Sequence, residues 1–130
     1  MRFEALASSS HGNAYIVSDK ETRILLECGL SRRKLQQLSG FRLSDITACV
    51  VSHEHKDHSG CVADLIAGGM PVYMSEGTAV ALGLEGNALE ADAACAVKTE
   101  ERIGHGGING GIFCRFAGSG DVIDLAFAAV

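Results

Sequence analysis

The fold is decided by the stretch Val50-Val51-Ser52-His53-Glu54-His55-Lys56-Asp57-His58-Ser59-Gly60. It continues a short, uncharged, β-branched run over 46–51, which is typical of a buried strand. Alternate side chains share a face in extended backbone, so we expect His53 and His55 to point at one ion. A turn after His55 would bring Asp57 and His58 to a second position nearby. Imidazole nitrogens and a carboxylate oxygen suit Zn²⁺, Fe or Mn²⁺.

The alternative to a metal site is a solvated loop whose histidines have no common partner. Three histidines and an aspartate within six residues, between a predicted strand and a predicted helix, favour the metal site. We therefore predict that His53, His55, Asp57 and His58 are metal ligands. The two residues between them, Glu54 and Lys56, are expected to face solvent.

The motif His-x-His-x-Asp-His resembles the signature of the metallo-β-lactamase fold superfamily. The upstream stretches 8–15 (Ser-Ser-Ser-His-Gly-Asn-Ala-Tyr) and 25–31 (Leu-Leu-Glu-Cys-Gly-Leu-Ser) resemble its YycJ-like (WalJ or VicX) branch of hydrolases and phosphodiesterases. The resemblance covers residues 1–84, approximately. It implies an α/β (α+β) fold, namely the N-terminal half of an αββα sandwich with a mixed sheet and short helices.

The same resemblance implies two metals bridged by a hydroxide, with Zn²⁺ expected and Mn²⁺ or Fe as alternatives. His53 and His55 would hold one metal and Asp57 and His58 the other, and later residues would complete both. Asp57 would also orient the metal-activated hydroxide, which makes it the predicted catalytic residue. Glu27 stands where many relatives carry aspartate and would support the histidine loop by accepting a hydrogen bond. The implied substrate is a phosphodiester, in nucleic acid or a small cyclic phosphate.

The later ligands are not evident in this sequence. His105 stands in a Gly-His-Gly-Gly setting that favours an exposed loop, and no motif surrounds Asp121 or Asp124. We therefore divide the chain into a metallo-β-lactamase-like N-terminal half, 1–84, and a Gly-rich, atypical or truncated tail, 85–130. A metal-dependent hydrolase is the leading hypothesis, and a non-catalytic metal-binding fragment of such an enzyme is the alternative.

Half a sandwich would leave one face of its sheet uncovered. We therefore expect Val50, Val51 and their neighbours to be exposed unless a second copy covers them in a homo-oligomer.

Composition indicates one globular domain. The chain has 130 residues, 47% hydrophobic and 21% charged. No apolar run approaches the ~20 residues of a membrane span, and there is no signal-peptide core, so we expect a cytoplasmic protein. Five scattered cysteines argue for reduced thiols; packing is the favoured role for Cys49 and, over metal binding, for Cys61. A net charge of −5 gives no basic field for nucleic acid.

Periodicity predicts an antiparallel meander at the N-terminus, followed by alternating helices and strands. Strands are expected at 2–6, 14–18, 23–27, 46–51 and 71–74, and helices at 32–38, 60–67 and 76–82. Ser31 should cap the first helix, with Leu35 and Leu38 facing inward. In the loop expected at 8–13, Ser9, Gly12 and Asn13 either line the mouth of the site or only form the turn.

Overall fold

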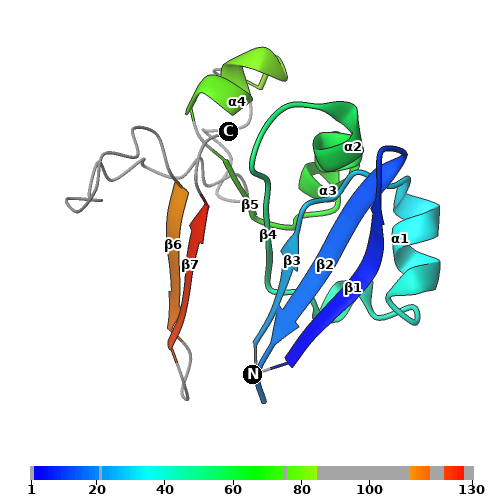
Figure 1. The fold of residues 1–130 in the computed structure, drawn as a ribbon, viewed down its shortest axis with the longest axis vertical. Helices are drawn as coiled ribbons and strands as arrows, with labels where there is room; N and C mark the ends of the chain where they lie inside the picture. The colour runs from blue at the N-terminus through cyan, green and yellow to red at the C-terminus, as the bar shows by residue number, and fades with distance from the viewer. Residues whose placement is uncertain (1, 21, 75, 85–111, 118–121, 128–130) are drawn as a thin grey trace.

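The computed structural model of the chain describes residues 2–20, 22–74, 76–84, 112–117 and 122–127. A five-stranded sheet, with short helices packed on one side, forms the main body (Figure 1). Its strands, in spatial order, are β1 (Arg2–Ser9), β2 (Gly12–Ser18), β3 (Arg23–Leu26), β4 (Ala48–Val50) and β5 (Val72–Tyr73). The helical segments are α1 (Arg32–Leu38), the 3-10 turn η1 (Leu43–Asp45), α2 (Lys56–Ser59), α3 (Val62–Ala67) and α4 (Glu76–Ala81). No helix of the described segments is long and apolar enough to cross a membrane.

The sheet is mixed, which confirms the predicted α/β (α+β) class. Strands β1, β2 and β3 pair antiparallel, as the predicted meander requires. Strands β3, β4 and β5 are parallel, so the chain must cross over between them, and helices make these crossovers. The parallel arrangement brings the carboxyl end of β4 to the same edge as the end of β3.

The predicted loop at 8–13 is wrong in length. Strand β1 continues to Ser9 and β2 starts at Gly12, so the turn is only Ser10-His11. Ser8 pairs with Asn13 in the ladder, and Ser9 pairs with Gly12. Hydroxyl-rich residues therefore form the end of a hairpin, because cross-strand pairing overrides their local preference for loops.

The core lies between the sheet and the helices. One face of the sheet contributes Ala14, Ile16, Leu25, Cys49, Val51 and Val72, and the helical layer contributes Leu35, Leu43, Val62 and Leu65. Removing these apolar side chains from water is the main favourable term in the stability of such a layer. The strands of this core carry the loops described below.

The predicted exposure of Val50 and Val51 is wrong, since both are 0% exposed in the single chain. Val51 faces the helices and belongs to the core cluster. Val50 points to the other face, where Val17 and Ile24 are also buried. Homo-oligomerisation stays a prediction, and the burial of Val50 and Val51 within the single chain gives it no support.

The hairpin consists of β6 (Ile112–Ala117) and β7 (Val122–Phe127), which pair antiparallel. Strand β7 thus gives the apolar segment that begins at Val122 a partner in β6. Asp124 lies on β7 opposite Arg115 in the ladder. His105 and Asp121 lie outside the described residues.

Helix α1 begins and ends as predicted. The Ser31 hydroxyl accepts a hydrogen bond from the Lys34 amide, and the left-handed Gly40 follows the helix. Leu35 is buried, but Leu38 is 36% exposed, so its predicted inward orientation is wrong. Residues three apart on a helix differ by about 60° in direction, and a helix of seven residues presents only a narrow stripe to the core.

These two leucines make a matched pair for a stability measurement. Leu35→Ala should lower the free energy of unfolding by about 3 kcal/mol, because it empties a fully buried site. Leu38→Ala, in the same helix, should cost less than about 1 kcal/mol. Urea denaturation followed by circular dichroism measures both, and equal losses would contradict the packing described.

Candidate metal centre

The histidine motif follows the carboxyl end of β4 and leads into α2. The predicted helix at 60–67 corresponds to α3, and a separate short helix, α2, precedes it and contains Asp57 and His58. Helix α2 begins directly after His55, because the His55 carbonyl accepts hydrogen bonds from the amides of His58 and Ser59, both at 2.9 Å. This first turn carries Asp57 and His58 back toward the preceding loop.

The four predicted ligands lie together at this end of the sheet. The ring centroid of His53 is 4.7 Å from that of His55 and 4.1 Å from that of His58. Asp57 Oδ2 is 3.4 Å from His58 Nε2. We call His53, His55, Asp57 and His58 the histidine cluster. The intervening Glu54 and Lys56 are exposed, as predicted.

Glu27 is a buried carboxylate directly beneath His58. Its Oε1 accepts a hydrogen bond of 3.1 Å from the Ser52 amide. Its Oε2 lies 3.1 Å from His58 Nδ1, and these two buried atoms face each other without the alignment of a hydrogen bond. The carboxylate beside Nδ1 favours the tautomer that carries its proton on this nitrogen. His58 Nε2, the nitrogen on the side of Asp57, then keeps its lone pair.

The backbone of Glu27 is left-handed, with φ at 66°. A non-glycine residue rarely adopts this conformation, and where one does, the surroundings impose it. Here the Glu27 amide donates to the Val50 carbonyl at 2.8 Å, so the residue is anchored to β4 at its main chain as well as at its side chain.

Main-chain contacts join the next two residues to α2. The Cys28 amide donates to the His58 carbonyl at 2.8 Å, and the Cys61 amide donates to the Cys28 carbonyl at 2.9 Å. Gly29 lies so close to Asp57 that a Cβ atom would overlap the Asp57 carbonyl. Only glycine permits this approach of the two backbones.

Asn13 is the hairpin residue that reaches the cluster. Its Nδ2 donates to the Asp57 carbonyl at 3.1 Å and lies 3.4 Å from Asp57 Oδ2 and 3.5 Å from His58 Nε2. The Ser9 hydroxyl instead accepts from the His11 amide within the turn. Gly12 packs against Leu30. Of the three residues considered for the mouth of the site, two serve the turn and its packing, and Asn13 contacts Asp57.

Three buried thiols, those of Cys28, Cys49 and Cys61, belong to the core and form no disulfide. Burial, helped by Cys28 and Asp64 nearby, raises the pKa of Cys61 to about 12. Burial and a hydrogen bond with Cys28 also hold the pKa of Cys49 well above its ordinary value. Both side chains are buried in the core cluster, which supports packing as the role of Cys49 and Cys61.

The histidine cluster fits a divalent cation in the chemistry of its donors. Three imidazoles and one carboxylate are ligands for Zn²⁺ and its neighbours in the first transition row. Within the described segments, no three His, Cys, Asp or Glu side chains form a ready-made metal site. His58 Nε2, the proposed ligand atom, faces Asp57 and the side-chain amide of Asn13. Convergence on one ion therefore requires rotation of side chains that already lie in contact.

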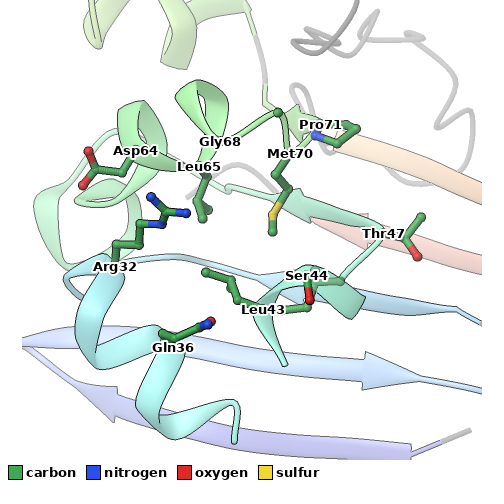
Figure 2. Close-up of a pocket in the computed structure, with 12 residues that line it drawn as sticks. Arg32, Gln36, Leu43, Ser44, Thr47, Asp64, Leu65, Gly68, Met70 and Pro71 are labelled. Atoms are coloured by element: carbon green, nitrogen blue, oxygen red, sulfur yellow. The ribbon is translucent and has the colours of Figure 1, made fainter. Parts of the chain in front are cut away.

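A cavity of about 430 Å³ lies at the other end of β4, between α1 and α3 (Figure 2). Leu43, Leu65 and Met70 form its apolar part, and Arg32 and Gln36 reach it from α1. It contains no residue of the histidine cluster. The chemistry-bearing side chains gather at the cluster, which is therefore the candidate site.

Several solved structures superpose on the fold of this chain. Among solved structures, a metallo-beta-lactamase from Pontibacter korlensis superposes with a TM-score of 0.56, covering 95% of this chain and 59% of that one at 20% identity. The metallo-beta-lactamase fold protein YhfI from Bacillus subtilis gives 0.57, covering 95% and 55% at 14% identity. At these identities the likeness establishes the fold, and confirms the expectation drawn from the motif.

The sequence comparisons reach further. The exodeoxyribonuclease YycJ of Bacillus anthracis is 33% identical over 82 residues, which are 60% of this chain and 31% of that protein. The chain thus spans about a third of the length of this relative. The sequence profile described as the metallo-beta-lactamase superfamily matches residues 9–93, which include β2, Glu27 and the whole histidine cluster. The chain therefore belongs to the metallo-β-lactamase superfamily.

Proposed function

We propose that this chain is part of a metal-dependent hydrolase that cleaves phosphodiester bonds, with DNA or another nucleic acid as substrate and a small cyclic phosphate as the alternative. One observation carries the proposal: the His53 ring lies 4.7 Å from the His55 ring and 4.1 Å from the His58 ring, with Asp57 and Glu27 beside His58. The name of the Bacillus anthracis relative, an exodeoxyribonuclease, supports the choice of substrate.

Each residue of the site has a proposed task. His53 and His55 hold one metal, and Asp57 and His58 hold a second; Zn²⁺ is the proposed ion, with Mn²⁺ or Fe as alternatives. When bound, such ions lower the pKa of water and polarise the phosphoryl group. Glu27 keeps the proton on His58 Nδ1, which leaves Nε2 free to bind. Asp57 accepts a hydrogen bond from the attacking water and orients it toward phosphorus.

The net charge of the chain affects how it can bind the proposed phosphodiester substrate. The chain carries a net charge of −5, which repels a polyanion at long range. Binding of a phosphodiester therefore depends on positive charge inside the site, and the proposed cations supply it. The proposed compartment is the cytoplasm, which the free thiols of Cys28, Cys49 and Cys61 support because such compartments keep thiols reduced.

A non-catalytic metal-binding fragment is the second candidate. It is favoured by the number of ligands, because the histidine cluster offers four side chains for two proposed metals, whereas a catalytic zinc alone usually takes about three protein ligands. The two candidates agree on metal binding and differ on turnover.

Metal binding is the first test. The purified chain should retain Zn²⁺ or Mn²⁺ after dialysis, and His53→Ala/His55→Ala should abolish retention because it removes half of the proposed ligands. Elemental analysis gives the stoichiometry. His11→Ala, which removes an exposed histidine from the β1–β2 turn, is the matched control and should bind as the wild type does. An unchanged stoichiometry in the double variant would sink the proposal.

Turnover separates the two candidates. We expect the chain to hydrolyse bis-p-nitrophenyl phosphate in the presence of Mn²⁺ or Zn²⁺, and Asp57→Asn to reduce kcat by about 100-fold or more. Asp64→Asn, the same change at an exposed position of α3, should leave kcat unaltered. Metal binding without wild-type turnover would favour the non-catalytic candidate, and turnover that survives Asp57→Asn would exclude the role given to Asp57.

The contact between Glu27 and His58 gives a third prediction. A carboxylate has two oxygens, and here each serves a different partner, the Ser52 amide and His58 Nδ1. The amide in Glu27→Gln has one oxygen, so one of these contacts is lost. Zn²⁺ affinity, measured by competition with a chelating dye, should fall about 10- to 100-fold. Glu54→Gln, at an exposed position of the same loop, should change it little; equal affinities in the two variants would contradict the role of Glu27.

A further inference from the structure

A chain of side-chain contacts runs along the β1–β2 hairpin toward Asp57. The Tyr15 hydroxyl lies 2.8 Å from Ser8 Oγ and 3.2 Å from Asn13 Oδ1. A phenol has one proton to donate, and the amide oxygen of Asn13 can only accept. Tyr15 therefore donates to Asn13, and Ser8 donates to Tyr15. This order determines which end of the Asn13 amide faces the hairpin and which faces the metal centre.

The amide nitrogen of Asn13 points into the cluster as a consequence. Its two protons are directed to main-chain oxygens, one at Ser9 (2.9 Å) and one at Asp57 (3.1 Å). The same nitrogen lies 3.4 Å from Asp57 Oδ2 and 3.5 Å from His58 Nε2. Asn13 is 9% exposed, so water competes little for these contacts. A residue needed only for the turn would have no reason to reach across 44 positions of sequence.

We propose that Asn13 and Tyr15 are positioning residues for the Asp57–His58 half of the metal centre. Asn13 binds the Asp57 backbone and places an N–H group beside the carboxylate and the imidazole nitrogen. Tyr15 fixes the amide in the orientation that makes this possible. The inference rests on the proposed function, since it assigns Asp57 and His58 to a metal. Neither residue touches the reacting atoms.

The test uses ¹⁵N-histidine-labelled protein titrated with Zn²⁺, because NMR then reports each imidazole separately. Asn13→Ala should weaken the response of His58 about 10- to 100-fold, the range for loss of a residue that supports a metal ligand. Tyr15→Phe should weaken it about 10-fold and keeps the ring that stacks on Phe3, so folding is not at risk. His53 should respond as in the wild type. Ser10→Ala, at an exposed position of the turn, is the control.

The outcomes separate this inference from the proposed function. Wild-type affinity at His58 in both variants overturns the inference and leaves the function standing. Equal weakening at His53 and His58 also overturns it, because a positioning role is local. If the wild-type protein shows no Zn²⁺ response, the proposed function fails. The hydrogen bond between Tyr15 and Asn13 can still be tested in metal-free protein. Unchanged side-chain amide resonances of Asn13 in Tyr15→Phe would show that this bond is absent and would overturn the inference.

Discussion

The histidine cluster has its place because the main chain after β3 is hydrogen-bonded to the main chain of α2. Cys28 exchanges hydrogen bonds with His58 and Cys61 on either side of the turn, and Gly29 lets the two backbones touch. Main-chain amides and carbonyls make these hydrogen bonds, and almost any residue type can supply them. The requirement for a particular residue type therefore falls on Gly29, where a Cβ atom would not fit. The parallel pairing of β3 and β4 makes the geometry available by ending both strands at one edge.

A buried carboxylate is costly unless each oxygen has a partner, and Glu27 shows how the fold meets that cost. One oxygen accepts from the backbone of the histidine loop, and the other faces His58. The left-handed backbone of Glu27 belongs to the same arrangement, because its amide is bonded to Val50 while its side chain reaches the loop.

Sequence patterns predicted the features that depend on residues close together in the sequence. The antiparallel meander, the cap at Ser31 and the grouping of the histidines follow from alternation, hydrogen-bonding chemistry and spacing. Prediction failed where the outcome depends on residues distant in sequence. The β1–β2 ladder extends into a hydroxyl-rich stretch, Val50 and Val51 are covered on opposite faces, and α1 turns Leu38 outward. The approach of Asn13 to Asp57 has no signal in the sequence, since only the folded hairpin brings them together.

Helix α2 has four residues, fewer than an isolated helix needs to form in water. Its order must come from the neighbouring backbone, chiefly the bonds that Cys28 makes to His58 and Cys61. Opening of α2 therefore breaks its hydrogen bond to Cys28, while Glu27 and Gly29 stay bonded to Val50 and Asn13. Each such opening would also carry Asp57 and His58 away from Asn13 and Glu27, so the histidine cluster would be lost as a unit.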